Sequence, residues 1–149
     1  MTTTVTADQQ DGQEKPPAEE RSYAIEPAAI ESQGRSVVVV VIDRLCDAAL
    51  AKLKTPDAWR QMSYAQIRRL ARENCAKQED YLSARQPVLE TVFRMLLVGP
   101  RETMMLGDIH EKLSELWTTS PWPRHIAINA LQRVLDSATH FGIVAVDVE

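Results

Sequence analysis

The last third of the sequence constrains the fold most strongly, because four patterns follow one another between residues 106 and 149. Apolar side chains recur at steps of three and four over residues 106–117 and again over residues 127–138, which predicts two amphipathic helices. The turn between them, at residues 118–123, reads Thr-Thr-Ser-Pro-Trp-Pro. An apolar segment rich in β-branched residues follows at 143–148 and favours a strand. The predicted order is therefore helix, turn, helix, strand.

The expected second helix spans residues 124–140. Gly142 stands just past its end, where a left-handed glycine commonly caps a helix. Upstream, Pro87 suits the first position of another helix that runs to Val98 and is stopped by Gly99 and Pro100. The broad apolar stripe of this helix predicts a place at the centre of the core.

The run from Ala130 to Ala138, followed by Phe141-Gly142-Ile143-Val144, resembles the end of the recognition helix and the first wing strand of winged helix-turn-helix proteins. The resemblance covers residues 88–149 when the helix after Pro87 is taken as the first helix of the module. In that family the recognition helix usually enters the major groove of DNA. The resemblance therefore implies a winged-helix-like half with a DNA-binding helix.

Carried onto this sequence, the resemblance implies a set of groove-facing side chains on the 124–140 helix. They are Arg124, His125, Asn129, Gln132 and Arg133. Arginine bonds guanine in bidentate fashion, and asparagine or glutamine does the same with adenine. The alternative is that these residues are only the solvated face of an amphipathic helix.

The middle of the chain carries the most basic surface. Ser63, followed three residues later by Gln66, matches a capping box and predicts a helix start. On that helix Arg68, Arg69 and Arg72 are expected to face outward and to assist in phosphate binding, or else to form a solvated face. A further alternative makes residues 63–76 and 87–98 a second helix-turn-helix.

Two departures from the winged-helix pattern favour a protein partner instead of DNA. The sequence ends at Glu149, where a wing hairpin would turn back, and its last residues are acidic. Trp122, between two prolines, is expected either to plug the core or to anchor a protein contact, since tryptophan is enriched in interface hot spots.

Charge divides the chain into three parts: residues 1–34 carry a net charge of −5, residues 35–83 of +3 and residues 84–149 of −2, in agreement with the total of −4. We expect residues 1–35 to be a disordered acidic tail, because their apolar residues are sparse. The alternative is that residues 23–30 dock on the domain as an extended arm. Residues 36–149 are expected to form one helical domain.

The valine run at 37–41 favours a strand by composition, but the apolar pattern continues at helical spacing through Leu53. We therefore predict a helix over residues 38–54. Its first turn is apolar all round, which indicates burial or a homodimer contact through residues 37–53. Cys46 and Cys75 fall on apolar sides of helices and are expected to be buried thiols, with a disulfide or a metal pair as alternatives.

No pattern indicates catalysis, a metal or another cofactor. The three histidines stand 15 residues apart, which matches no metal motif, and the five glycines are scattered singly. The longest apolar run is far shorter than the roughly 20 residues of a membrane-spanning helix, and the N-terminus does not look like a secretory signal. We expect a cytoplasmic protein without a membrane partner.

These observations predict a mainly α, single helical domain with a winged-helix-like C-terminal half and one short C-terminal strand. Two functions remain open. The first is a non-enzymatic DNA-binding transcriptional regulator, and the second is a protein–protein adaptor that uses the same surface without binding DNA.

Overall fold

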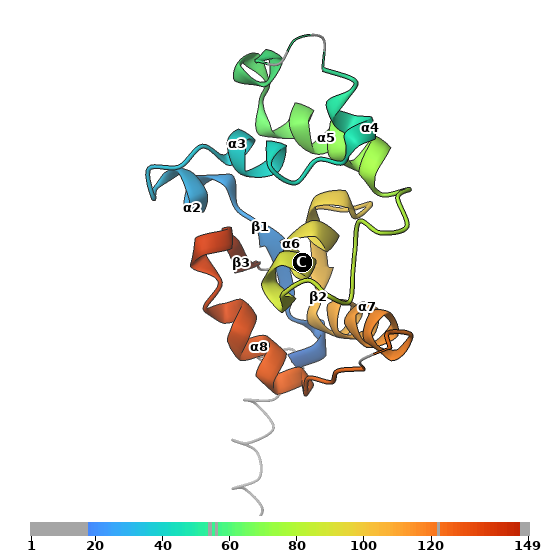
Figure 1. Ribbon diagram of the computed structural model, residues 1–149. Helices are drawn as coiled ribbons and strands as arrows, with labels where there is room; N and C mark the ends of the chain where they lie inside the picture. The colour runs from blue at the N-terminus through green and yellow to red at the C-terminus, as the bar shows by residue number, and fades with distance from the viewer. Residues whose placement is uncertain (1–17, 54, 56, 122, 147–149) are drawn as a thin grey trace, which may run out of the picture.

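The computed structural model of the chain describes residues 18–53, 55, 57–121 and 123–146. Helices dominate, and three short strands form one sheet (Figure 1). In chain order the elements are η1 (Ala18–Glu20), β1 (Ser22–Ile25), α2 (Pro27–Glu31), α3 (Val37–Ile42), α4 (Asp47–Leu50), η2 (Ala58–Gln61), α5 (Tyr64–Cys75), α6 (Val88–Val98), β2 (Thr103–Met105), α7 (Leu106–Thr118), α8 (Ile128–Asp136), η3 (Thr139–Phe141) and β3 (Ile143–Val146).

Helix α6 lies at the centre of the molecule, as the width of its apolar stripe predicts. Figure 1 shows α3, α4 and α5 above it, α7 and α8 below it, and the sheet alongside. The side chains of Phe93, Leu96 and Leu97 on α6 are at most 1% exposed. They join one continuous core with residues of the helices above and below and of β1 and β3. The mainly α prediction is confirmed, and the sheet has more strands than the single one expected.

The sheet corrects the expected N-terminal boundary. Its strand order is β2-β1-β3, with both pairings antiparallel, so β1 from the start of the described chain is the central strand. Tyr23 on β1 and Ile30 on α2 are fully buried. Residues 18–35 are therefore part of the domain and not of a disordered tail, because their few apolar side chains are concentrated where they reach the core. The alternative, an extended arm over residues 23–30, holds in part: β1 is extended and docked in the sheet, but the chain is helical again from Pro27. Residues 1–17 lie outside the described residues.

The predicted helix over residues 38–54 is interrupted. Helix α3 ends at Ile42, and α4 begins only at Asp47. The guanidinium of Arg44 donates to the carbonyl of Val40 and to both carboxylate oxygens of Glu90 on α6. The amide of Cys46 donates to the Sγ of Cys75 on α5, 3.1 Å away. The amide of Cys46 thus bonds to α5 instead of to a carbonyl of α3, and the side chain of Arg44 ties the break between α3 and α4 to α6.

The interruption between α3 and α4 also affects where the valine side chains of residues 37–41 are buried. Val37, Val38, Val40 and Val41 are at most 9% exposed and pack inside the chain's own core. Val39 on α3 and Leu50 on α4 remain exposed. The 37–53 segment therefore keeps no broad apolar face for the homodimer contact that the sequence suggested.

Three helix boundaries agree with the sequence. The side chain of Ser63 accepts from the amide of Gln66, and the side chain of Gln66 accepts from the amide of Ser63, so the capping box of α5 is confirmed. Helix α6 ends at Val98, before Gly99. Helix α7 covers the first of the two C-terminal amphipathic patterns.

The last helix is shorter than predicted. Helix α8 spans Ile128–Asp136, and the chain from Pro123 to Ala127 is not helical. Gly142 has a φ of +69° and lies in the left-handed region, as its position predicts. A Cβ at Gly142 would also fall 2.5 Å from Cγ1 of Ile30, so this glycine lets α2 approach the turn before β3. None of the helices among the described residues is both long and apolar enough to cross a membrane.

Candidate functional site

The polar face of α8 is exposed, as expected for a binding surface. Asn129 and Arg133 on α8 face solvent, as does His125 just before it, and Gln132 is half-buried. Helix α8 itself carries one basic residue, Arg133, and one acidic residue, Asp136. The helix therefore offers polar groups to a partner but little net charge.

Arg124 is exposed, but its guanidinium is bound by the chain's own backbone, which the resemblance did not imply. Its guanidinium donates to the backbone carbonyls of Ala84 and Gln86, at 3.1 and 3.0 Å. It also lies over the ring of Trp117, with 4.3 Å between its Cζ and the ring centroid. Arg124 thus fastens the segment before α8 to the connection between α5 and α6.

The outward orientation expected for the arginines of α5 is wrong for one of the three. Arg68 is only 6% exposed, and its Nη2 donates to the carbonyls of Leu96, Gly99 and Arg101. It caps the C-terminal end of α6, whose last carbonyls have no partner within the helix. Arg69 is exposed and Arg72 is half-buried, as expected of a surface pair.

The two predicted basic sets do not meet. Helix α5 lies at the upper end of the molecule and α8 at the lower end, with α6 between them (Figure 1). Arg69 and Arg72 therefore form no continuous positive surface with Arg133. Trp122, the other candidate contact, lies outside the described residues.

The acidic start of the described chain lies beside the α8 surface. Helix η1, which carries Glu19 and Glu20, packs against α7 and α8. Gly107 permits this approach, because a Cβ there would fall 3.3 Å from both the Cβ and the carbonyl oxygen of Glu19. Next to η1, Arg21 forms an ion pair with Asp136 at 3.7 Å and is thereby partly neutralised.

The histidines serve local packing. Nε2 of His110 lies 2.8 Å from the carbonyl of Ile126, and the ring of His110 meets that of His125 edge to face. Among the described residues no group of three or more histidine, cysteine, aspartate or glutamate side chains is placed to hold a metal ion.

A groove that the sequence did not reveal runs beside β2 and has a volume of about 1140 Å³. All three residues of β2 line it, together with the end of α6, one side of α7 and the row of the sheet that contains Ser22. Ser22 pairs with Met105 on one side and with Val146 on the other, so the groove crosses the sheet at this row. Met105 is 42% exposed, and among the described residues the other exposed large apolar side chains are Val39 and Leu50.

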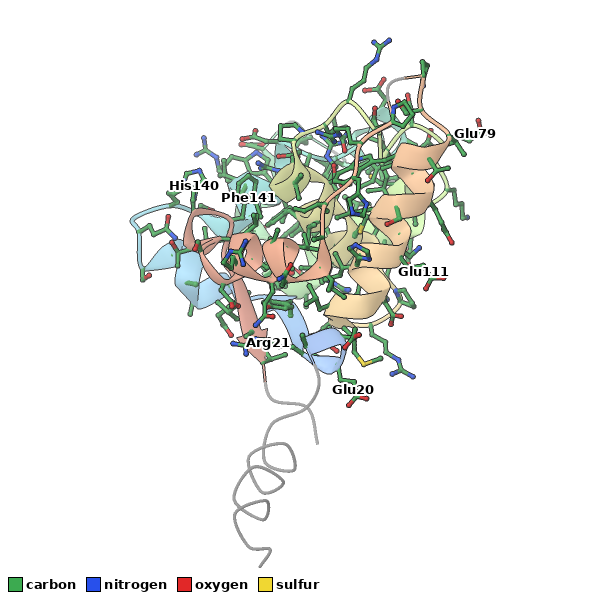
Figure 2. All side chains as sticks on the ribbon, turned by 90° about the horizontal axis from the view of Figure 1, so that it is seen from below. Glu20, Arg21, Glu79, Glu111, His140 and Phe141 are labelled. Atoms are coloured by element: carbon green, nitrogen blue, oxygen red, sulfur yellow. The ribbon has the colours of Figure 1, made fainter. Side chains whose placement is uncertain are left out.

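The charged side chains of the groove come from α7, from the start of the described chain and from the loop after α6. Asp108, Glu111, Lys112 and Glu115 follow one side of α7 at helical spacing. Glu20 and Arg21 contribute from the start of the described chain; in Figure 2, Glu20 and Glu111 lie on one side of the molecule and His140 and Phe141 on the other. With Arg101, the groove holds four carboxylates and three cationic side chains.

The outer edge of β2, on the side away from β1, is open. Among the described residues β2 pairs with β1 alone, so the main-chain groups on its far side have no strand partner. The sequence held one signal of this site: Met104 and Met105 follow the helix-stopping Gly99 and Pro100 and precede the next apolar helix. Two adjacent methionines do not by themselves distinguish an edge strand from a helix start.

Comparison with known proteins found no match. No protein family matches the sequence, and no curated protein and no solved structure is significantly similar to it.

Proposed function

We propose that this protein is a non-enzymatic protein-binding module that takes an extended segment of its partner along the free edge of β2. The single observation that carries the proposal is the position of this edge strand on the wall of a groove of about 1140 Å³. An extended peptide adds to an open sheet edge through main-chain hydrogen bonds, and pockets for alternate side chains give specificity.

The lining of the groove suits such a segment. Met95, Met104 and Met105 supply flexible apolar contacts, and methionine is frequent on surfaces that accept varied side chains. The carboxylates on α7 outnumber the single lysine between them. We therefore expect a partner segment that alternates apolar side chains with at least one lysine or arginine on the α7 side.

The chain order of the C-terminal half supports a winged-helix-like origin for this module. Helix α6, strand β2, helices α7 and α8 and strand β3 follow one another, and β1 pairs antiparallel with β3. A returning wing strand would pair with β3 in the same way. We propose that β1, supplied from before the helices, takes the place of the second wing strand beside β3.

The charges near α8 favour a protein over DNA as the partner. A protein that neutralises several phosphates needs several free lysine or arginine side chains on one surface. Helix α8 offers Arg133 alone, while Arg68 and Arg124 are engaged with backbone carbonyls. Glu19 and Glu20 lie on η1, against the same helix.

DNA-binding regulation is the second candidate, and one observation favours it. Asn129 and Arg133 are exposed on α8, and both side chains have the chemistry to read base edges. A regulator of this kind would bind duplex DNA with an affinity that falls steeply as salt is added.

The proposed function is tested by selecting random peptides from a displayed library against the full chain and measuring their affinity. Met105→Glu places a charge on the groove, and Leu50→Glu places the same charge at an equally exposed apolar site on α4. We expect Met105→Glu to weaken binding about tenfold or more, which is about 1.4 kcal/mol, and Leu50→Glu to leave it unchanged.

Two results would contradict the proposal. One is a set of selected peptides whose affinity is indifferent to Met105→Glu but lost in Arg133→Glu, which would place the site on α8. The other is salt-sensitive binding of random duplex DNA without peptide binding, which would support the regulator. In that case Arg133→Ala is expected to relax the preference at one base pair.

A further inference from the structure

The two cysteines of the chain lie in contact with each other. The Sγ of Cys75, at the end of α5, is 2.9 Å from the Sγ of Cys46, just before α4. The amide of Cys46 also donates to the Sγ of Cys75 at 3.1 Å. Both are free thiols. A disulfide requires sulfur atoms about 2.05 Å apart, so closing this pair takes about 1 Å of movement.

The two thiols differ in their access to solvent. Cys75 is fully buried, whereas Cys46 is half-buried and lines a cleft of about 310 Å³. Arg44 and Arg94 line the same cleft. Asp43, Asp47 and Asp80 line it as well, so the cleft is polar and accessible to a small polar oxidant.

A buried polar group without a partner adjoins the pair. Tyr81 lines the cleft and is only 5% exposed, and its hydroxyl has no hydrogen-bond partner among the described residues. A buried hydroxyl rarely stays unpaired, because its desolvation costs free energy that a hydrogen bond would recover. The hydroxyl of Tyr81 is therefore a donor and acceptor that the described residues leave unused.

We propose that Cys46 and Cys75 form a dithiol site that hydrogen peroxide oxidises to an intramolecular disulfide. Cys46 is the residue that reacts with peroxide, because it is the thiol that lines the cleft, whereas Cys75 is fully buried. Cys75 is the residue that then resolves the intermediate.

The reaction proceeds in two balanced steps. The thiolate of Cys46 attacks one oxygen of the peroxide, the O–O bond breaks, and the products are a sulfenic acid on Cys46 and hydroxide. The sulfur of Cys75 then attacks the sulfur of the sulfenic acid. The S–S bond forms, the S–O bond breaks, and the departing hydroxyl takes the thiol proton of Cys75 to leave as water. Two thiols are oxidised by two electrons, and one peroxide is reduced to two waters.

The division of roles agrees with the environment of Cys75. Burial raises the pKa of its thiol to about 12, so it stays protonated and does not compete for peroxide. It reacts only when an electrophilic sulfur is already in contact with it.

The disulfide would act on the molecule through α5. It would tie the end of α5 to the start of α4, and Ala76, the next residue after Cys75, lines the β2 groove. Oxidation at this site thus fixes part of one groove wall. The dithiol chemistry itself is independent of the proposed partner binding.

The experiment treats the full-length protein with hydrogen peroxide and follows its mass and its thiols. The wild type is expected to lose both thiols and two hydrogen atoms while remaining one chain, and dithiothreitol is expected to reverse the change. In Cys75→Ser, a dimedone probe should capture the sulfenic acid at Cys46. In Cys46→Ser, capture at Cys75 should be about tenfold lower or less, because that thiol is buried and protonated.

Two results would overturn the proposal. The first is a wild type that keeps both thiols at a peroxide concentration that oxidises the same chain unfolded in urea. The second is faster capture at Cys75 in Cys46→Ser than at Cys46 in Cys75→Ser. The wild-type measurement needs neither variant, so it tests disulfide formation even if a substitution disturbs folding.

Discussion

The phenol of Tyr23 on β1 donates a 2.7 Å hydrogen bond to the carboxylate of Asp136 at the end of α8, across 113 residues of sequence. The bond joins the first strand of the described chain to the last helix. It shows that the N-terminal arm is a structural part of the C-terminal half, where the sequence suggested a separate tail. The stability of the candidate binding surfaces therefore depends on β1.

Removing this hydrogen bond is expected to lower the free energy of unfolding. Tyr23→Phe keeps the buried ring but leaves a carboxylate oxygen of Asp136 without its donor, which costs about 0.5–1.5 kcal/mol. Urea unfolding followed by circular dichroism measures this difference. Equal stability of wild type and Tyr23→Phe would mean that water replaces the phenol at no cost.

The same bond predicts a dependence on alkaline pH. Burial and the neighbouring Asp136 raise the pKa of Tyr23 from 10.0 to about 12. A group whose pKa is higher in the folded state stabilises the fold below its unfolded value, and that contribution is lost as the pH rises through its folded value. The wild type is therefore expected to lose stability between about pH 10 and 12, and Tyr23→Phe is expected to lose less. Burial likewise raises the pKa of Tyr64 to about 12, so part of the loss remains in the variant.

The central position of β1 is tested by a proline at Ala24. Proline removes a main-chain donor and is not tolerated in a central strand, so Ala24→Pro is expected to cost about 3 kcal/mol or more. Ala24→Ser, which keeps the donor and nearly the same volume, is the matched control, and its effect should stay below about 1 kcal/mol. If thermal unfolding gave similar midpoints for the two variants, β1 would not be held between β2 and β3.

Much of the fold was predictable, because the signals were local. The capping box at Ser63, the stop at Gly99 and the left-handed Gly142 depend on a few neighbouring residues, and the structure agrees at each. The interruption between α3 and α4 was not predictable, since it depends on Arg44 reaching Glu90 and on Cys46 reaching Cys75. These pairs are distant in sequence, and no periodicity records them.

In the candidate sites, too, local features were predictable and contacts between distant segments were not. The exposure of Asn129 and Arg133 follows from the apolar pattern of α8 and was foreseen. The burial of Arg68 was not, because a position that looks solvent-facing on one helix lies against the carbonyls at the end of another. The β2 groove arises only when β1, distant in sequence from β2, pairs with its other edge.

Arg68 is expected to matter for stability and not for binding. Arg68→Met keeps the length of the side chain but leaves the carbonyls of Leu96, Gly99 and Arg101 without their shared donor, which is expected to cost about 2–4 kcal/mol. Arg69→Met, at the exposed neighbouring position, should change stability by less than about 0.5 kcal/mol. Chemical denaturation of the two variants in parallel measures the difference. Equal free energies of unfolding would mean that the hydrogen bonds of Arg68 do not stabilise the fold.

The carboxylate of Glu90 predicts the response to acid. Burial alone would raise its pKa, but hydrogen bonds from Arg44 and Arg94, both 2.9 Å long, outweigh burial and lower the pKa below 4.5. A lowered pKa contributes stability above the unfolded value, and this is lost as the pH falls through the folded value. Wild-type stability should therefore fall as the pH drops below about 4.5.

The matched variant is Glu90→Gln, which keeps the shape and removes the charge. It is expected to be less stable at neutral pH by about 2–3 kcal/mol, because two half-buried guanidinium groups lose their anion. Its stability should then change less than that of the wild type on acidification. Parallel curves of unfolding free energy against pH for the two proteins would contradict this role of Glu90.

The most direct test of the central claim is amide hydrogen exchange in the presence of a peptide selected against the full chain. An added strand gives the outward amides of β2 new acceptors, so we expect slower exchange within Thr103–Met105 and along the facing side of α7, with α8 unchanged. Slower exchange confined to α8, with no change in β2, would contradict the account and place the binding surface on the helix.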